Sequence, residues 1–225
     1  MCRSLSISSC DRGKVEPLKE FNVVVTGVGG QGTLLLSRLI AAAARREGFV
    51  VQTGETLGMA QRGGSVVSFV RYGEKVFTPI VPDHKADLLI SLEPVEALRS
   101  IRYVRSATRI LLNTRPKPPL SIILGEAKYP DVKEIEAVLK SVGAETFAFD
   151  AAKLAETAGD ARAANVSMLG GMAALRESSI KVENFREALK DVLPERLIQV
   201  NMQAFKLGYD TVILLSPLPH LKSRI

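Results

Sequence analysis

The first third of the chain alternates between two hydrophobic periods. Residues 21–26 are apolar and β-branched, which is typical of a buried strand. Residues 33–47 carry a run of four alanines that favours a helix, and residues 49–53 are strand-like again. This order predicts a βαβ unit with a Rossmann-like start.

The middle of the chain predicts further strands and a hairpin. Residues 65–71 have the pattern of a strand, residues 72–74 that of a turn, and residues 75–78 that of a returning strand, which would make the sheet mixed. Short buried strands are predicted at 87–91, 109–113 and 145–149, and helices at 93–103 and 131–141.

The C-terminal part is mostly helical, with predicted segments at 151–158, 163–177, 182–193 and 194–208. Pro194 suits the start of the last helix and Gly208 its end. We therefore expect an α/β fold: a three-layer α/β/α domain at 21–215 with a mixed, mostly parallel sheet. Residues 1–20 and 216–225 are expected to be tails.

A glycine-rich loop follows the first predicted strand. It consists of Gly27, Gly29 and Gly32 in the pattern G-x-G-x-x-G, with Gly30 and Gln31 between them. Between a strand and a helix, such glycines let a backbone approach a pyrophosphate, which suggests a dinucleotide site. Glu55 follows the loop at about the sequence separation of a ribose-binding acid. Such an acid ends a strand that leads to a helix, whereas Glu55 is expected in a loop that leads to a hairpin. The alternative is that the glycines only form a tight turn.

A second glycine-rich segment, residues 54–64, ends in Gln61-Arg62-Gly63-Gly64. Loops at the carboxyl ends of neighbouring strands line the ligand crevice of open α/β sheets, so we expect both segments at one site. Arg62 would bring a forked cation there, whose natural partner is a carboxylate or another anion. The alternative for Arg62 is an ordinary surface arginine. Asn165 either reaches this polar site or caps its own helix.

Composition narrows the chemistry. The sequence has 225 residues, 46% of them hydrophobic, and no apolar run long enough to span a membrane. Its only cysteines, Cys2 and Cys10, and its only histidines, His84 and His220, do not form a metal-binding pattern, so we expect no metal site. No nucleophile–base pair is evident either. Residues 1–20 do not have the pattern of a secretory signal, and we expect a cytoplasmic protein.

The charge does not indicate a nucleic-acid partner. The formal net charge is +6, but the basic residues are scattered and aromatic residues make up only 5% of the chain. A solvated surface is the favoured interpretation, and a basic patch that faces an acidic protein is the alternative.

Several sequence blocks together resemble a known family. They are Gly-Gly-Gln-Gly at 29–32, Gly-Met-Ala-Gln-Arg-Gly-Gly at 58–64, residues 65–73, Leu-Leu-Ile-Ser-Leu-Glu-Pro-Val-Glu at 88–96, and the later blocks at 164–170 and 201–210. They are similar to the gamma-type subunit or domain of 2-oxoacid:ferredoxin oxidoreductases, and most of all to the small (beta) subunit of the indolepyruvate enzymes. The resemblance covers nearly all of residues 21–210.

The resemblance implies a subunit that is inactive without a large partner. In this family the partner subunit carries thiamine diphosphate and iron–sulfur clusters, and an aryl 2-oxoacid, coenzyme A and oxidised ferredoxin give an acyl-CoA, carbon dioxide and reduced ferredoxin. No cofactor is then expected on this chain alone. The matching motif positions are 29–32 and 61–64, with Arg62 and Gln61 as the candidate catalytic residues. Gly27, Glu55 and Asn165 complete the candidate cofactor-binding set.

Three alternatives stay open. Pyruvate, 2-oxoglutarate and branched-chain oxoacid enzymes use related gamma subunits. The first glycine loop could serve a stand-alone oxidoreductase that binds NAD(P) or FAD. The chain could also be a scaffold that contributes nothing to the site. In isolation an obligate subunit is expected to expose an apolar patch, so a homodimer of the isolated chain would not be surprising.

Overall fold

The structure is a computed structural model that describes residues 20–57, 64–118, 128–142 and 145–216. Within these residues six strands form one sheet in the order β2-β3-β1-β4-β5-β6. The strands are β1 (Phe21–Val28), β2 (Val50–Leu57), β3 (Ser65–Gly73), β4 (Leu88–Ser91), β5 (Arg109–Asn113) and β6 (Glu145–Phe149).

The sheet is mixed because β3 runs against its two neighbours. It pairs antiparallel with β1 on one side and with β2 on the other, whereas β1, β4, β5 and β6 follow one another in parallel. The expected mixed, mostly parallel sheet is therefore confirmed. The predicted returning strand at 75–78 is wrong, because β2 is the hairpin partner of β3 and both edges of β3 are already paired. Thr78 instead accepts hydrogen bonds from the Arg71 guanidinium through its carbonyl and hydroxyl oxygens.

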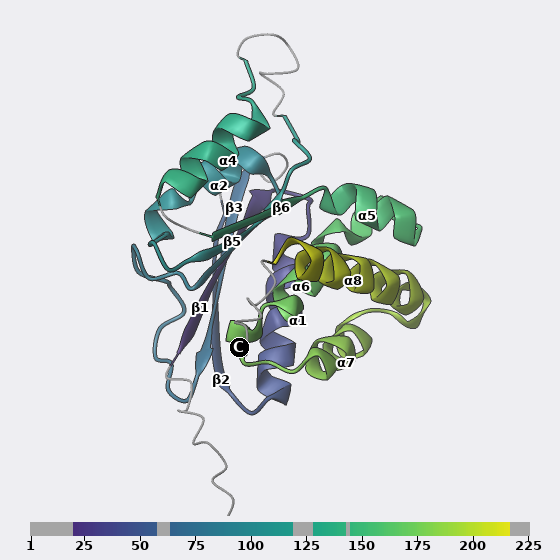
Figure 1. Cartoon of the computed structure of the whole chain (residues 1–225). Coiled ribbons are helices and arrows are strands. Elements are labelled where there is room, and N and C mark those ends of the chain that lie inside the picture. Colours follow the sequence, from purple (N-terminus) through teal and green to yellow (C-terminus); the bar gives the residue numbers. More distant parts are fainter. Residues whose placement is uncertain (1–19, 58–63, 119–127, 143–144, 217–225) are drawn as a thin grey trace, which may run out of the picture.

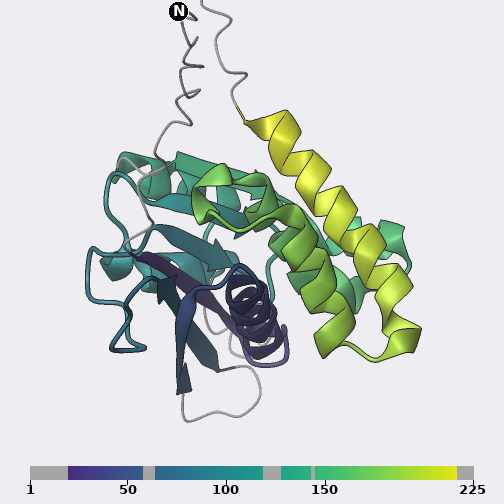
Figure 2. The same ribbon diagram turned by 90° about the horizontal axis from the view of Figure 1, so that it is seen from below.

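Helices cover both faces of the sheet, which confirms the three-layer architecture (Figure 1). On one face lie α1 (Thr33–Arg46), α5 (Ala151–Ala158), α6 (Ala164–Ala174), α7 (Val182–Val192) and α8 (Glu195–Leu215). On the other lie α2 (Pro94–Arg99) and α4 (Val132–Ser141). Three short 3-10 helices, η1 (Ile101–Tyr103), η2 (Ala161–Ala163) and η3 (Arg176–Ser178), join these elements. Figure 2 shows α7 between α1 and α8, all three on the same side of the sheet.

The sheet separates the two large hydrophobic clusters of the described core. In β1, Val23 and Val25 face the cluster under α1 and α5 to α8, and Val24 faces the cluster under α2 and α4. All three valines are fully buried. A central strand with both faces covered must be apolar along its length, which explains why residues 21–26 lack alternation.

Helix α8 is longer than predicted. Gly208 was expected to end this helix, but α8 continues to Leu215, and the prediction is wrong. A Cβ atom on Gly208 would lie 1.8 Å from the Ser167 carbonyl oxygen of α6, and one on Gly170 would lie 2.0 Å from the Phe205 carbonyl oxygen of α8. Gly208 therefore serves the close backbone contact of α6 with α8 and does not terminate the helix.

Other boundaries shift as well. The predicted helix at 93–103 is interrupted at Ser100 and becomes α2 and η1, and the one predicted at 163–177 ends at Ala174. Strand β2 runs to Leu57, so Glu55 lies in a strand and not in a loop as expected. None of the helices in the described ranges is long and apolar enough to cross a membrane.

Candidate functional site

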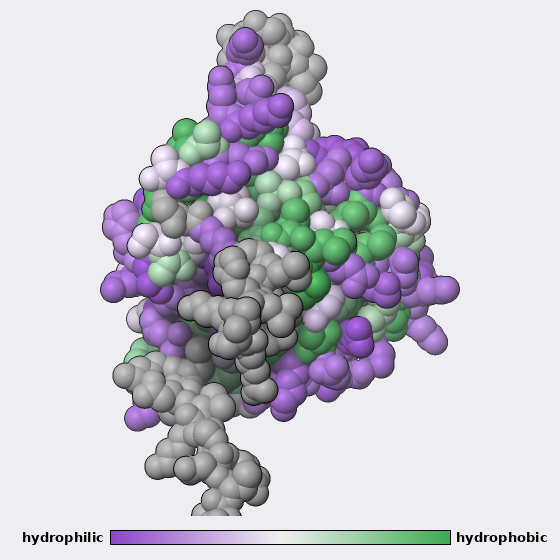
Figure 3. Space-filling view, viewed as in Figure 1, coloured by the Kyte–Doolittle hydropathy of each residue, from purple (hydrophilic) through white to green (hydrophobic). Residues whose placement is uncertain are grey.

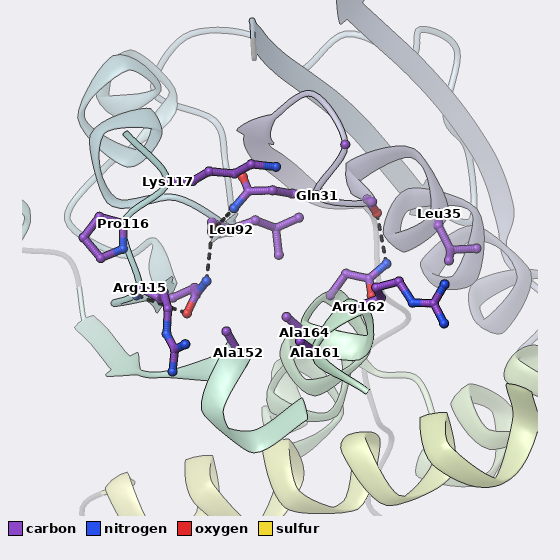
Figure 4. Close-up of a pocket in the computed structure, with 14 residues that line it drawn as sticks. Gln31, Leu35, Leu92, Arg115, Pro116, Lys117, Ala152, Ala161, Arg162 and Ala164 are labelled. Atoms are coloured by element: carbon purple, nitrogen blue, oxygen red, sulfur yellow. Dashed lines mark hydrogen bonds between the residues drawn. The ribbon is translucent and has the colours of Figure 1, made fainter. Parts of the chain in front are cut away.

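A cavity of about 410 Å³ opens at the carboxyl edge of the sheet (Figure 4). Its walls come from the loop at 30–32 after β1, Leu92 after β4, residues 113–117 at the end of β5, the start of α5, and residues 161–165 around the start of α6. The chain leaves β1 for α1 on one face of the sheet and leaves β4 for α2 on the other. Ligands of open α/β sheets bind at such a switch point.

The first glycine loop is fixed to neighbouring strands by Gln31. The Gln31 Oε1 atom accepts a hydrogen bond from Val28 N at 2.7 Å, and its Nε2 atom donates to the Leu92 carbonyl at 2.9 Å (Figure 4). Gly29 N donates to the Gly64 carbonyl at 2.9 Å, which joins this loop to the end of the second glycine segment. This contact brings the end of the second segment next to the first loop, and whether both segments line one site stays a prediction because residues 58–63 lie outside the described residues.

Asn113 is a site residue that sequence reasoning missed. Its Nδ2 atom donates to the same Leu92 carbonyl at 3.0 Å, and its Oδ1 atom accepts from Ala151 N at 3.0 Å and Arg115 N at 3.3 Å. One buried amide thus fixes the chain just after β4, the start of α5 and the residues that follow β5. The signal was a polar residue closing the otherwise apolar run Ile-Leu-Leu-Asn at 110–113.

Asn165 lies beside the glycine that begins α1. Gly32 adopts a left-handed backbone with φ 83°, and its carbonyl accepts a hydrogen bond from Asn165 Nδ2 at 3.2 Å. Asn165 is 3% exposed, and its Oδ1 atom has no hydrogen-bond partner among the described residues. Buried polar atoms are normally paired, so this oxygen is an acceptor available to an N–H or O–H group of a ligand. Asn165 lies inside α6 and does not cap it.

Positive charge surrounds the cavity, but only part of it is neutralised. Arg115 pairs with Asp150 and Glu156, each at 2.8 Å, and Arg162 pairs with Asp160 at 2.7 Å. Lys117 forms no ion pair with any described residue, and its Nζ atom lies 3.8 Å from the position of a Cβ atom on Gly30. Figure 4 shows Lys117 beside Gln31, with Arg162 and Leu35 across the cavity.

The charge state of Asp150 supports the conclusion that Arg115 is neutralised and Lys117 is not. Burial acts to raise the pKa of Asp150, but hydrogen bonds from Arg115 and from Lys153 N lower it overall. The carboxylate therefore stays ionised and neutralises Arg115. Lys117 is left as the cation without an acidic partner in the described part of the cavity wall.

The start of α1 adds to the positive electrostatic potential at the cavity. Gly32 supplies no side-chain cap, and the first turn of α1 contains no acidic residue. No acidic side chain of α1 therefore offsets the positive end of its dipole at the loop that lines the cavity. Together with Lys117 and the Asn165 oxygen, this positive end suits a ligand that carries an anionic group next to a hydrogen-bond donor.

The predicted site residues do not all meet. Gly30, Gln31, Gly32 and Asn165 line the cavity, whereas Gly27 and Gly29 lie just behind it and Gly64 contacts Gly29. Gln61, Arg62 and Gly63 lie outside the described residues.

Glu55 sits on β2 and does not line the cavity. Because β3 lies between β1 and β2, Glu55 is one strand further from the glycine loop than the ribose-binding acid of a Rossmann fold.

The described ranges show no candidate metal site. They contain no group of three or more His, Cys, Asp or Glu side chains that could hold a metal ion. The pair Gly159-Asp160 superficially resembles a thiamine-diphosphate fingerprint, but Asp160 caps η2 and binds Arg162. Its carboxylate is therefore already committed to a local structural role.

Comparison with known sequences places the chain in a family. The family model described as pyruvate ferredoxin/flavodoxin oxidoreductase matches residues 22–211. The chain is 42% identical over 192 residues to the indolepyruvate oxidoreductase subunit IorB of Thermococcus kodakarensis, covering 85% of this chain and 95% of that subunit. It is 25% identical over 190 residues to the pyruvate/ketoisovalerate oxidoreductases common subunit gamma of Thermococcus litoralis, covering 84% and 95% of the two chains.

Solved structures share the fold. The gamma subunit of a keto/oxoacid ferredoxin oxidoreductase from Geobacter sulfurreducens superposes with a TM-score of 0.65 at 21% identity, covering 86% of this chain and 99% of that one. The 2-oxoglutarate:ferredoxin oxidoreductase from Magnetococcus marinus, with 2-oxoglutarate, coenzyme A and succinyl-CoA bound, gives a TM-score of 0.68 at 19% identity, covering 88% and 32% of the two chains. The chain therefore belongs to the pyruvate ferredoxin/flavodoxin oxidoreductase family.

Proposed function

We propose that this chain is the small subunit of an indolepyruvate, or other aryl 2-oxoacid, ferredoxin oxidoreductase. The observation that carries the proposal is the high identity to an indolepyruvate subunit over nearly its whole length. The identity to the pyruvate/ketoisovalerate subunit is much lower. The reaction converts an aryl 2-oxoacid, coenzyme A and oxidised ferredoxin into an acyl-CoA, carbon dioxide and reduced ferredoxin, and the cytoplasm is the compartment that holds these reactants.

We assign thiamine diphosphate and the iron–sulfur clusters to the large partner subunit. Two cysteines are too few for the four thiolates of one cluster, and Asp160 is engaged by Arg162. Thiamine diphosphate there supplies the carbanion chemistry of decarboxylation. This chain contributes binding and orientation, through the cavity at the carboxyl edge of its sheet.

The cavity suits the anionic part of coenzyme A. Lys117 and the uncapped start of α1 provide positive charge, and Asn165 Oδ1 provides an acceptor for an amide or hydroxyl donor. The Magnetococcus marinus neighbour was solved with coenzyme A bound, which supports this choice of ligand. In the proposal Gly30, Gln31 and Gly32 form the cavity wall, and Gly27, Gly29 and Gly64 shape the loop behind it. Gly63 stays a candidate from the sequence alone. Glu55 has no support as a ribose contact because of its place on β2.

The test of the proposed function is reconstitution. The chain is co-expressed with the thiamine- and cluster-bearing subunit of the same cells, and coenzyme A-dependent dye reduction is measured with indolepyruvate, phenylpyruvate, pyruvate and 2-oxoglutarate. We expect turnover with the two aryl oxoacids. Preference for pyruvate or 2-oxoglutarate would move the chain to a related enzyme, and saturable NAD(P) binding by the chain alone would support the stand-alone alternative.

Arg62 and Gln61 are the candidate catalytic residues, and they can be tested in the same complex. Arg62→Ala is expected to lower turnover by about tenfold or more, because it removes a cation from the assembled site. Arg45→Ala, at the exposed C-terminal end of α1, is the control and should leave turnover unchanged. Equal turnover in both variants would favour the scaffold alternative.

A further inference from the structure

Two carboxylates at the start of α2 are almost completely buried, one at its N-cap and one in its first turn. Glu93 is 2% exposed and Glu96 is 3% exposed. Glu96 forms an ion pair with Arg99 at 2.7 Å and accepts from the Ser65 hydroxyl at 2.5 Å. Glu93, by contrast, forms no ion pair with any residue in the described ranges. A buried carboxylate without a cation is costly, so its hydrogen-bond donors need to be accounted for individually.

One oxygen of Glu93 has a local structural role. Glu93 is the N-cap of α2, and its Oε2 atom accepts from Glu96 N at 3.1 Å. Such caps are common and stabilise a helix start by satisfying a free N–H group. The cap explains the place of the Oε2 atom. It does not explain the hydrogen bonds of the Oε1 atom, which join Glu93 to residues distant in the sequence.

The other oxygen contacts the chain segment that carries Lys117. The Oε1 atom accepts from Lys117 N at 3.3 Å and from the Tyr129 hydroxyl. Burial, followed by the hydrogen bond to Glu93, raises the pKa of Tyr129, so its hydroxyl keeps the proton that it donates. Glu93 therefore holds the backbone of Lys117, whose ammonium group has no acidic partner among the described residues of the cavity wall.

The chain around Lys117 makes this contact effective. Pro116 and Pro118 flank Lys117 and restrict the backbone on both sides, but neither has an N–H group to anchor the segment. Within 116–118 only Lys117 has a backbone N–H group, and Glu93 accepts its hydrogen bond. A shift of that backbone would move the Nζ atom away from the loop at Gly30.

We propose that Glu93 is a positioning residue that sets the place of Lys117 at the anion-binding cavity. The proposal rests on the proposed function, in which the cavity binds coenzyme A. Glu93 does not touch the ligand and acts only through the Lys117 backbone and Tyr129. It therefore governs affinity for coenzyme A and leaves the chemical step unchanged.

Glu93→Asp separates this role from the cap. Aspartate is a favourable N-cap and keeps the charge, but it is shorter by one methylene and withdraws from Lys117 N and Tyr129. In the reconstituted complex we expect about three- to tenfold weaker binding of coenzyme A by calorimetry, a matching rise in KM for coenzyme A, and kcat within about twofold. The melting temperature of the complex is recorded in parallel.

Glu96→Asp is the matched control. It makes the same shortening at an equally buried carboxylate on the same helix, and Glu96 has no contact with Lys117. It is expected to leave coenzyme A affinity unchanged. Equal loss in both variants would show that any loosening of α2 weakens binding, which would overturn the positioning role.

Lys117→Ala completes a double-mutant cycle with Glu93→Asp. It also separates the positioning role of Glu93 from the proposal that the cavity binds coenzyme A. It is expected to weaken coenzyme A binding by about tenfold, and Glu93→Asp should then have no further effect in that background. If Lys117→Ala weakens binding but Glu93→Asp does not, only the positioning role is overturned. If Lys117→Ala leaves affinity unchanged, the assignment of the cavity to coenzyme A fails, and the positioning role fails with it.

Discussion

At the scale of single residues, the contact between Gly32 and Asn165 does two things at once. Gly32 turns the chain from β1 into α1 in a left-handed backbone conformation that residues other than glycine rarely adopt. Its carbonyl orients the Asn165 amide. The hydrogen bond fixes which end of that amide is the donor. The Oδ1 atom, which has no hydrogen-bond partner among the described residues, is thereby left for a ligand.

Gly32→Ala tests this contact. A Cβ atom would lie 2.5 Å from Asn165 Nδ2, and the backbone at φ 83° adds strain, so we expect a loss of about 2–4 kcal/mol in the free energy of unfolding. Gly48→Ala is the control, because Gly48 has φ 97° but nothing within 4 Å of the added atom. It should cost only about 1–2 kcal/mol. Denaturant titration measures both, and equal losses would mean that Asn165 simply moves aside.

At the scale of elements, the pairing of α6 with α8 decides where the C-terminal helices lie. Two glycines, Gly170 and Gly208, allow the backbones of these helices to touch. Helix α6 in turn carries Asn165 to the cavity, so the packing of α8 has a direct consequence for the site. Sequence propensity alone suggests that Gly208 weakens or ends a helix, which is the opposite of its role here.

Gly208→Ala is expected to destabilise the protein although alanine favours helices. The intrinsic gain is about 1 kcal/mol, but the new Cβ atom would meet the Ser167 backbone, and we expect a net loss of about 2 kcal/mol or more. Gly171→Ala is the control. Its Cβ atom would lie 3.0 Å from a Val212 side-chain atom, which can move. A stabilised Gly208→Ala protein in thermal melts would contradict the packing described.

The start of α5 predicts a pH dependence. Asp150 caps α5 through Lys153 N and pairs with Arg115, and its pKa in the folded protein is lowered. A lowered folded pKa stabilises the protein above the unfolded value of about 3.9 and stops doing so as the pH falls through the folded pKa. Asp150→Asn keeps a cap and should cost about 0.5–1 kcal/mol near neutral pH.

Thermal melts from neutral pH to about pH 3 check this prediction, because the wild type and Asp150→Asn should converge as the carboxylate is protonated. Asp131→Asn, at the cap of α4, provides the comparison. Asp131 accepts from Lys133 N and has no arginine partner among the described residues. A constant difference between wild type and Asp150→Asn across this range would contradict a contribution from the Arg115 pair.

At the scale of the whole molecule, the surface indicates a subunit that meets a partner. At the end of α8, Ile213 and Leu215 are about half exposed and Leu214 is 84% exposed. On the face shown in Figure 3, hydrophobic residues gather over the helical layer and hydrophilic residues surround them. Exposed apolar residues of this kind are what we expect on a subunit that is buried against a partner.

The purified chain is expected to have no oxoacid-dependent activity of its own. It should fold, since a large hydrophobic cluster is buried on each face of the sheet, yet turnover should appear only after the large subunit is added. Circular dichroism establishes that the isolated chain is folded, and dye reduction with indolepyruvate and coenzyme A measures activity before and after mixing. Activity in the absence of the large subunit would contradict the proposed function.

The sequence by itself determined the layers of the fold and much of the candidate site. Apolar strands and amphipathic helices alternate because each element must bury a face, and that pattern is local. The loop at 29–32 was also predictable, because its glycines stand between a clear strand and a clear helix. Gln61, Arg62 and Gly63 remain predictions, since they lie outside the described residues.

Only the tertiary structure decided which strands pair and which polar groups are left free. The insertion of β3 between β1 and β2 depends on long-range pairing, and it separates Glu55 from the glycine loop. Gly208 is indistinguishable from a helix terminator until α6 is seen against it. Asn113, Lys117 and Glu93 are ordinary residues in sequence. Their roles come from hydrogen bonds between segments far apart in the chain, which no local pattern encodes.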